Sequence, residues 1–140
     1  AIDLHPDVEP VVFVPSVVLS TATARSVLPA EVPLSVAAAN GGRVGLLVHA
    51  LAQDPSLLLP ATLDRLHQEP RRPSYPASMA LVDELRSAGV AATISGAGPT
   101  VLALTTPDRA DAVAGSVPAG GPWRVLRPGV PTVGVRATSD

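Results

Sequence analysis

One stretch of sequence, VAATISGAGPTVLAL at residues 90–104, decides the fold. Its apolar ends, 90–94 and 101–104, are rich in aliphatic residues and have the length of short strands. The six residues between them, 95–100, contain two glycines and a proline, which predicts a tight turn. Glycine also tolerates positive φ and lets another backbone or a phosphate approach closely. From these residues alone, a plain hairpin turn and a phosphate-contacting loop are both open.

Helical patterns lie on both sides of this pair of strands. Residues 77–88 place Met79, Val82 and Leu85 on one face of a helix, and Gly89 is a typical helix end. On the C-terminal side, the pattern predicts a helix from Thr106-Pro107 to residue 113, a turn over 119–122, and strands over 123–126 and 132–135.

The N-terminal half supplies one more strand and several helices. The β-branched run 11–18 predicts a strand with an edge or a bulge at Pro15. The segments that follow are a short helix capped by Ser20 and ending at 27, a longer helix capped by Ser35 over 36–53, a helix over 57–67, and a proline-rich loop over 69–76. This order predicts an α+β fold, a ferredoxin-like sandwich with an antiparallel sheet and helices on one face.

Composition excludes several classes of protein. Hydrophobic residues make up 46% of the chain and charged residues 16%, which is typical of a globular domain. All ten basic residues are arginine, so the chain lacks the lysine of a Walker-type phosphate loop and of a Schiff-base mechanism. Cysteine is absent, which excludes disulfides and thiolate metal sites and fits a reducing, cytoplasmic setting.

Neither nucleic acid nor a membrane is expected as a partner. The net charge is −2, and the longest basic run is Arg71-Arg72. Proline, glycine or charge interrupts every apolar run before about 18 residues, so no membrane-spanning helix is expected. The three histidines lack metal-ligand spacing, so no metal site is expected, and His67 is interpreted as a helix-end contact.

Two pairs of polar residues are candidate binding groups. Thr21 and Arg25 are four apart and share a helix face, and an arginine held in this way suits a carboxylate. Asn40 and Arg43 share a face of the next predicted helix. From the residues alone, surface positions without a ligand are the plainer interpretation of both pairs.

The glycine turn also carries a family resemblance. The stretch ATISGAGPTVLAL at 92–104 is similar to the third conserved motif of the GHMP kinase superfamily, in the form most typical of homoserine kinases. In that family the loop lies near the nucleotide phosphates. The resemblance therefore implies that Ser95, Gly96, Ala97 and Gly98 lie close to the phosphates of ATP.

Two further segments resemble the substrate-binding parts of homoserine kinases. LSTATARSVLP at 19–29 is similar to a segment whose threonine and arginine face the amino-acid substrate, which implies roles for Thr21 and Arg25. DRLHQEPRR at 64–72 is similar to a segment whose arginine holds the substrate carboxylate. Without a gap that position is Arg71, and Arg72 is the alternative if the loop is shifted by one.

The third such segment, AAANGGRVGLL at 37–47, matches the family's Asn-x-x-Arg and implies a substrate role for Asn40. The chain departs from the family at two places. Val36 stands where an aspartate is usual, and Glu69-Pro70 replaces a Pro-Tyr pair.

The resemblance covers residues 11–135 but only about half of the family's usual length. The main phosphate loop of the family has no counterpart here, and neither do its acidic ligands for Mg²⁺ and the substrate amine. The resemblance thus implies that residues 1–10 lead in from a missing domain and that 11–140 form a GHMP kinase C-terminal domain. ATP and Mg²⁺ would be bound mainly by the missing half, and no catalytic or metal-binding residue is assigned to this chain.

The implied function is that of part of a kinase that transfers the γ-phosphate of ATP to the hydroxyl of L-homoserine, in threonine biosynthesis. The segment alone is expected to be inactive, and a homodimer is compatible with the sequence. Two alternatives stay open: another GHMP small-molecule kinase, or a non-catalytic ferredoxin-like module that binds a regulatory ligand.

Overall fold

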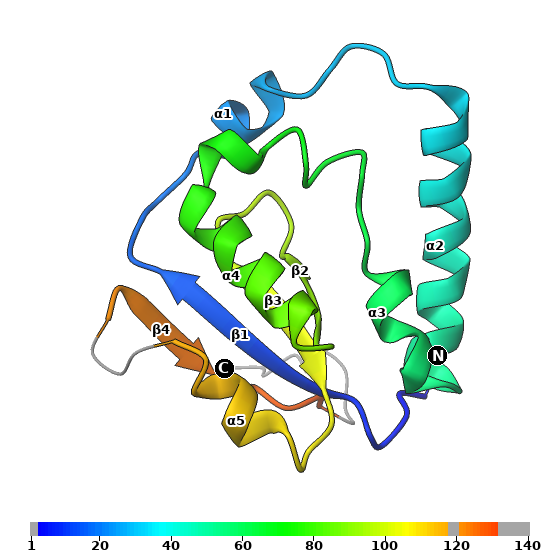
Figure 1. The fold of residues 1–140 in the computed structure, drawn as a ribbon, viewed down its shortest axis with the longest axis vertical. Coiled ribbons are helices and arrows are strands. Elements are labelled where there is room, and N and C mark those ends of the chain that lie inside the picture. Colours follow the sequence, from blue (N-terminus) through cyan, green and yellow to red (C-terminus); the bar gives the residue numbers. More distant parts are fainter. Residues whose placement is uncertain (1–2, 118–120, 132–140) are drawn as a thin grey trace, which may run out of the picture.

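The sheet has four strands in the order β2-β3-β1-β4, and every neighbouring pair is antiparallel. The computed structural model describes residues 3–117 and 121–131. In chain order the elements are β1 (Glu9–Pro15), α1 (Thr21–Ser26), α2 (Leu34–Ala52), η1 (Pro55–Leu57), α3 (Leu58–Ala61), η2 (Arg72–Ser74), α4 (Pro76–Ser87), β2 (Ala91–Ile94), β3 (Val101–Thr105), α5 (Ala110–Ala114) and β4 (Trp123–Leu126). Figure 1 shows this arrangement, which confirms the predicted α+β fold and the ferredoxin-like strand order.

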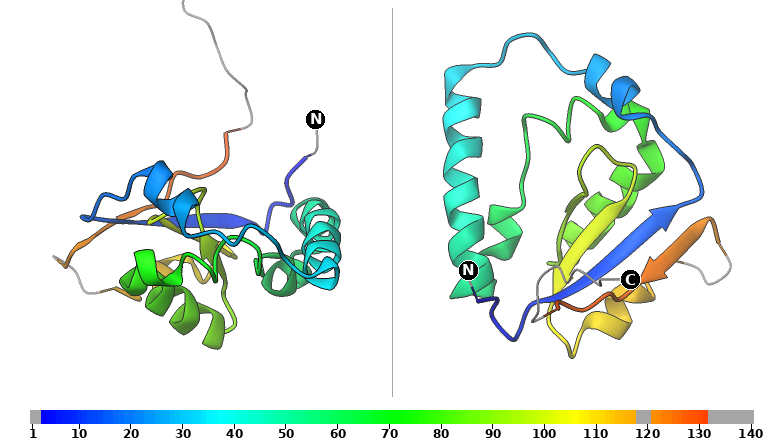
Figure 2. Two further views of the ribbon diagram at one scale, coloured as in Figure 1. Left: turned by 90° about the horizontal axis from the view of Figure 1, so that it is seen from above. Right: turned by 180° about the vertical axis from the view of Figure 1, so that it is seen from behind.

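One face of the sheet carries the main core. Along β1, Val11 and Phe13 are fully buried, and Phe13 is paired with Val101 of β3 and Val125 of β4. The helices α4 and α5 cover this face, as Figure 2 shows in the view from above. The period-two alternation of the strands therefore meets the apolar stripe of α4 that the sequence predicts.

A second apolar cluster lies beside β2, away from the main core. It joins Ala50 of α2 and Leu58 of α3 to Val8 and Ala91. Of the helices, α2 and α3 therefore pack around the β2 edge, whereas α4 and α5 form the layer on the sheet face (Figure 1).

Most predicted elements are present, but the cap of the long helix is different. The helix α2 begins at Leu34, and its N-cap is Pro33, which makes no side-chain cap hydrogen bond. The backbone oxygen of Pro33 accepts from the amides of Val36 and Ala37. Ser35 therefore lies inside the first turn, and its assignment as the cap is wrong. The fixed φ of proline, here −57°, sets the chain for a helix start two residues earlier than predicted.

The predicted helix over 57–67 is mostly wrong. Its α-helical part is only Leu58–Ala61. Side chains compete with the helix beyond that point: the Thr62 hydroxyl donates to the oxygen of Leu58, and the Asp64 carboxylate accepts from two following amides. The last predicted helix is also shorter than expected, since α5 begins at Ala110 after a turn. The predicted strand over 132–135 and residues 119–120 of the predicted turn lie outside the described residues.

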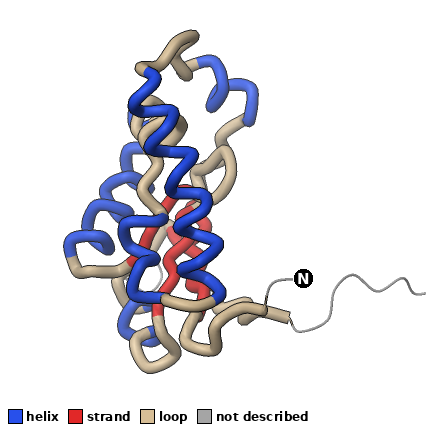
Figure 3. Tube along the Cα trace, turned by 90° about the vertical axis from the view of Figure 1, so that its right-hand side faces the viewer, coloured by secondary structure: helices blue, strands red, loops and turns tan. Residues whose placement is uncertain are grey.

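The helix α2 is long and largely exposed. By length and composition alone it could cross a membrane, although one such helix is weak evidence for a membrane span. The sequence-based prediction of no spanning helix counted its glycines and Arg43 as interruptions. Only Ala50 of α2 is fully buried. Figure 3, in which the side carrying α2 faces the viewer, shows the helix lying along the outside of the molecule.

Candidate functional site

A depression of about 600 Å³ lies where α1, the segment after α3 and the glycine loop come together. Its lining residues are Thr21, Arg25, Asp64, His67, Arg71, Ile94, Gly96 and Ala97. Three segments distant in sequence thus contribute to one surface. Among the residues singled out by sequence, Thr21, Arg25 and Arg71 line it together with Gly96 and Ala97. Ser95, Gly98 and Asn40 are not part of this lining.

The short helix α1 presents two of these side chains. Ser20 caps it as predicted, because its hydroxyl oxygen accepts from the amide of Thr23 at 3.0 Å. The cap fixes where the helix starts, and Thr21 and Arg25 then lie on one face at a spacing of four residues. Ala24 is the one fully buried residue of α1 and anchors the helix to the rest of the domain.

The side chain of Arg71 is hydrogen-bonded to the backbone of α1. The residue is only 7% exposed, and its Nε donates to the oxygen of Ala24 at 2.8 Å. This hydrogen bond uses one of the five donors of the guanidinium group and leaves the terminal nitrogens for other partners. Arg71 lines the depression together with Arg25. The lining thus carries two guanidinium groups from separate segments and one carboxylate, that of Asp64. The guanidinium groups suit a carboxylate or a phosphate.

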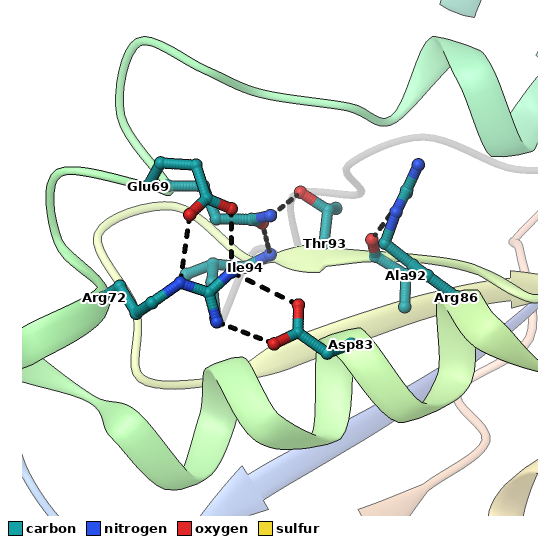
Figure 4. A network of polar contacts seen from close by, with 8 residues as sticks. Glu69, Arg72, Asp83, Arg86, Ala92, Thr93 and Ile94 are labelled. Atoms are coloured by element: carbon teal, nitrogen blue, oxygen red, sulfur yellow. Dashed lines mark hydrogen bonds and ion pairs between the residues drawn. The ribbon is translucent and has the colours of Figure 1, made fainter.

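The neighbouring Arg72 points elsewhere and is occupied by two carboxylates. Its nitrogens donate to both oxygens of Asp83 at 2.7 and 3.2 Å, and to both oxygens of Glu69 at 3.0 and 2.9 Å (Figure 4). The hydrogen bonds to Asp83, and then those to Glu69, raise the pKa of Arg72 above its usual range. Arg72 is not among the residues that line the depression. The two adjacent arginines thus have different environments.

The glycine loop is a turn built by its own backbone. The amide of Ser95 donates to the oxygen of Thr100 at 2.8 Å, and the amide of Gly98 donates to the oxygen of Ser95 at 3.1 Å. The Gly98–Pro99 peptide is cis, and the oxygen of Pro99 accepts from the hydroxyl of Ser78 at 2.6 Å. The loop is therefore tied to α4 as well as to its two strands.

The two glycines of this loop have different surroundings. Both have positive φ, +60° at Gly96 and +83° at Gly98. A Cβ at Gly98 would lie 2.7 Å from Cε1 of Tyr75, so the ring of Tyr75 packs where a side chain would stand. A Cβ at Gly96 would meet nothing within 4 Å. Gly96 thus leaves open space beside the depression, which a ligand can approach, whereas Gly98 serves packing.

Tyr75 lies under the loop with a buried hydroxyl. The residue is 4% exposed, and its hydroxyl has no hydrogen-bond partner among the described residues. Burial raises the pKa of this hydroxyl, and the nearby guanidinium group of Arg71 offsets part of that rise.

Asp64 and His67 were not predicted as site residues. The Asp64 carboxylate accepts from the amides of Leu66 and His67 at 2.8 and 3.0 Å, and its other oxygen lies 3.2 Å from Nδ1 of His67. The expected end-of-helix contact of His67 is thus a contact within a turn. An aspartate that closes a turn over the next three residues is a recognisable local signal, but it gives no indication that the turn faces a depression.

Gln68 was also missed, and it positions β2. It is 4% exposed, and its side-chain oxygen accepts from the amide of Ile94 at 2.8 Å and from the hydroxyl of Thr93 at 3.0 Å. These contacts bind the end of β2, where the glycine loop begins, to the segment that carries Arg71. No sequence pattern marks such a glutamine, because its partners are about 25 residues away.

Asn40 lies next to this site but in a separate small depression. Its side-chain oxygen accepts from the amide of Arg65 at 3.2 Å. The depression, of about 170 Å³, is also lined by Arg43, Asp64 and Thr93. Asp64 lines both depressions, and Asn40 links α2 to the turn that carries Asp64.

No group of three or more His, Asp or Glu side chains is placed to hold a metal ion within residues 3–117 and 121–131. Two arginines and the glycine loop of the described surface suit an anion.

Comparison with known proteins places this surface in a family. The family model described as "GHMP kinases C terminal" matches residues 41–122. The homoserine kinase of Streptomyces avermitilis is 59% identical over 116 residues, which cover 81% of this chain and 38% of that protein. The homoserine kinase of Streptomyces coelicolor is 54% identical over 132 residues, covering 93% of this chain and 42% of that protein. This chain thus spans about two fifths of the length of these relatives.

Solved structures agree with the sequence relatives. The crystal structure of homoserine kinase from Cytophaga hutchinsonii matches with a TM-score of 0.74 and 29% identity, and the match covers 81% of this chain and 37% of that one. A structure from Listeria monocytogenes matches with a TM-score of 0.57 and 24% identity, which supports the fold alone. The family model covers more than half of the chain, and the fold agrees with it. The chain therefore belongs to the GHMP kinase family and corresponds to its C-terminal domain.

Proposed function

We propose that this chain is the C-terminal part of a kinase that transfers the γ-phosphate of ATP to the hydroxyl of L-homoserine. In this proposal residues 11–140 form the C-terminal domain, and residues 1–10 lead in from a preceding domain. The similarity to relatives named homoserine kinase, at 59% and 54% identity, supports it. The proposed setting is threonine biosynthesis in the cytoplasm.

The observation that carries the proposal is the meeting of Thr21, Arg25 and Arg71 on one surface. Two guanidinium groups that converge from separate segments can hold one carboxylate through several charge-assisted hydrogen bonds. An amino-acid substrate provides such a carboxylate, and a sugar does not. Asn40 contributes indirectly: its side-chain oxygen accepts from the amide of Arg65, next to Asp64 in the lining of this surface.

The glycine loop is proposed to lie close to the ATP phosphates. Gly96 and Ala97 line the depression beside the arginines, and the space beside Gly96 is open. Backbone amides at such a loop can face phosphate oxygens. Ser95 and Gly98 contribute by closing the turn through the hydrogen bond between them.

The described residues do not fit a magnesium site, because no cluster of acidic side chains lies among them. We therefore assign Mg²⁺ and most contacts to ATP to the part of the full-length protein outside this chain. Phosphoryl transfer depends mainly on positioning and on charge stabilisation. The role proposed for this domain is to hold the substrate by its carboxylate while the hydroxyl faces the γ-phosphate.

The test uses the full-length protein and matched substrates. ATP-dependent phosphorylation is measured with L-homoserine and with 3-aminopropan-1-ol, which is the same molecule without the carboxylate. We expect kcat/KM to be at least about 100-fold higher for L-homoserine, because two arginines would lose their partner. Equal values for both alcohols, or a clear preference for a sugar alcohol, would overturn the proposal.

The same assay tests the short chain. The 140 residues alone are expected to give no phosphorylation, since the proposed ATP contacts lie mainly outside them. Phosphorylation by the short chain would show that these residues suffice for catalysis.

A further inference from the structure

One side of α2 is apolar and uncovered. Its residues recur at helical spacing and form what is called here the outer face of α2: Leu34, Ala38, Gly41, Val44, Gly45 and Val48. Leu34, Val44 and Val48 are 85%, 63% and 45% exposed. The only charged residue of α2 is Arg43, which is half-buried on the opposite side. A continuous apolar face of this kind on a folded domain marks a contact surface.

The glycines of α2 strengthen this interpretation. Glycine inside a helix is destabilising relative to alanine, so its presence calls for a reason. A Cβ at Gly41, Gly42 or Gly45 would meet nothing within 4 Å in the described structure. Packing within this domain therefore does not explain them. Small residues on a helix face allow another element to approach the helix axis closely, which would explain Gly41 and Gly45 on the outer face.

Arg43 lies away from the outer face of α2. Its Nη1 is buried and has no hydrogen-bond partner among the described residues. Arg43 lines the small depression between α2 and the turn at Asp64. A buried guanidinium nitrogen is normally hydrogen-bonded, and a water molecule in this depression can serve as its acceptor, so Arg43 belongs to the small depression and not to the outer face.

The start of the described chain lies beside this helix. The amide of His5 donates to the oxygen of Leu51 at 2.8 Å, and Leu4 packs against the apolar cluster of α2. Figure 1 shows the N-terminal end next to the lower end of α2. The described chain therefore begins next to α2. The relatives that this chain matches are more than twice its length, since the chain spans 38% and 42% of them.

From these observations we infer that the outer face of α2 is the docking surface for the part of the full-length protein that precedes this chain. That part places apolar side chains against the outer face of α2. The inference rests on the proposed function only insofar as it takes this chain to be part of a longer kinase. It assigns the contact to one helix face and leaves the charged outer side of α4 free.

Cysteine labelling can test this directly, because the chain has no cysteine of its own. Val48→Cys is placed on the outer face, and Ala80→Cys on the exposed side of α4 is the matched control. Both variants are made in the full-length protein, with any other cysteines replaced, and are labelled with a maleimide before and after denaturation in urea. We expect native labelling of Val48→Cys to be at least about 10-fold slower than that of Ala80→Cys, and the two rates to become equal in urea.

Further measurements identify what covers the face. A photo-crosslinking residue at position 48 is expected to give intramolecular crosslinks to peptides that precede this chain. Equal native labelling at 48 and 80 overturns the inference. So does protection that disappears on dilution to the monomer, which would identify a second copy, or protection that requires phosphatidylcholine vesicles, which would identify a lipid surface.

Catalysis is measured on the same samples, so that the two proposals can fail separately. Rapid labelling of Val48→Cys in a protein that phosphorylates L-homoserine would overturn the docking surface alone. A protected Val48→Cys in a protein without that activity would overturn the proposed function alone.

Discussion

The Nε of Arg71 donates to the backbone oxygen of Ala24 at 2.8 Å and joins two segments that are 47 residues apart. This hydrogen bond places the segment after α3 against α1, so that Arg71 and Arg25 line the same depression. The contact uses a backbone oxygen, so it depends on the position of α1, which the buried side chain of Ala24 anchors.

Arg71→Lys tests the proposed carboxylate contact. Lysine keeps the positive charge but loses the forked geometry that can hold the Ala24 oxygen and a carboxylate at once. We expect KM for L-homoserine in the full-length protein to rise by roughly 10- to 100-fold, with a smaller change in kcat. Arg72→Lys is the matched control and is expected to change KM by less than about threefold, because Arg72 faces Glu69 and Asp83. A larger change in KM for the Arg72 variant would reverse the assignment of the two arginines.

The ion pairs of Arg72 with Glu69 and Asp83 are expected to stabilise the segment between α3 and α4 modestly. The ion pair with Asp83 is partly exposed, so its coupling energy should be about 0.5–1 kcal/mol. A double-mutant cycle of Arg72→Gln and Asp83→Asn, followed by urea unfolding, measures that energy. It should decrease in 1 M salt, since salt screens exposed charges. A coupling energy near zero at low salt would mean that the pair of Arg72 and Asp83 does not stabilise the segment between α3 and α4.

Alanine at the two loop glycines separates packing from ligand approach. Gly98→Ala should lower the free energy of unfolding by about 2–4 kcal/mol, because the new Cβ combines a positive φ with a clash against Tyr75. Gly96→Ala meets open space and should cost only about 1–2 kcal/mol, from its positive φ. Thermal unfolding checks both values. The contrast fails if the two variants are equally destabilised.

Tyr75→Phe removes a buried hydroxyl that has no partner among the residues described. We expect a change of less than about 1 kcal/mol in the free energy of unfolding, because no hydrogen bond is lost. Tyr75→Ala should cost about 3–5 kcal/mol, because the ring packs beneath Gly98.

Tyr75 also predicts a dependence on pH. Burial raises the pKa of its hydroxyl in the folded state, so the unfolded chain ionises first as the pH rises. The stability of the wild-type protein should therefore fall above about pH 10, and the Tyr75→Phe variant should lose less over the same range. Identical pH profiles in urea unfolding would contradict this assignment.

Arg86 links three elements, and its loss should be costly. Its terminal nitrogens donate to the hydroxyl of Thr62 at 2.9 Å, to the oxygen of Ala92 at 3.0 Å and to the oxygen of Leu59 at 2.7 Å. Burial lowers the pKa of Arg86, which nevertheless keeps its charge near neutral pH. Arg86→Met should lower the free energy of unfolding by about 2–4 kcal/mol, since it leaves acceptors of α3 and β2 unpaired. Thermal unfolding of Arg109→Met, an exposed arginine with one longer contact, provides the comparison.

The parts of the fold that sequence predicted well are those set by local chemistry. The alternation in β1 and β3, the stripe of α4 and the glycine turn each depend on neighbouring residues, and all are present. The segment between α3 and α4 was predicted poorly. Its path depends on side chains that bind distant backbone, such as Gln68 at Ile94 and Arg71 at Ala24. The periodicity of apolar residues in the sequence does not predict such contacts.

The candidate site was predictable in part for the same reason. The spacing of Thr21 and Arg25 already indicated one helix face, and α1 has that face. The adjacency of Arg71 came only from a family resemblance, and His67 was placed outside the site. The exposure of α2 was also missed, because an apolar helix pattern is the same whether the face meets its own domain or another surface.

The position of β1 has a consequence for how the chain folds. This strand lies inside the sheet, yet it is the first of the described strands in chain order. Phe13 is paired with Val101 and Val125, roughly 90 and 110 residues further along the chain. During synthesis, β1 and the apolar helix α2 therefore leave the ribosome before β3 and β4, the two strands that pair with β1. We expect folding to be slow for a domain of this size, and the growing chain to be prone to aggregation until β3 has been synthesised.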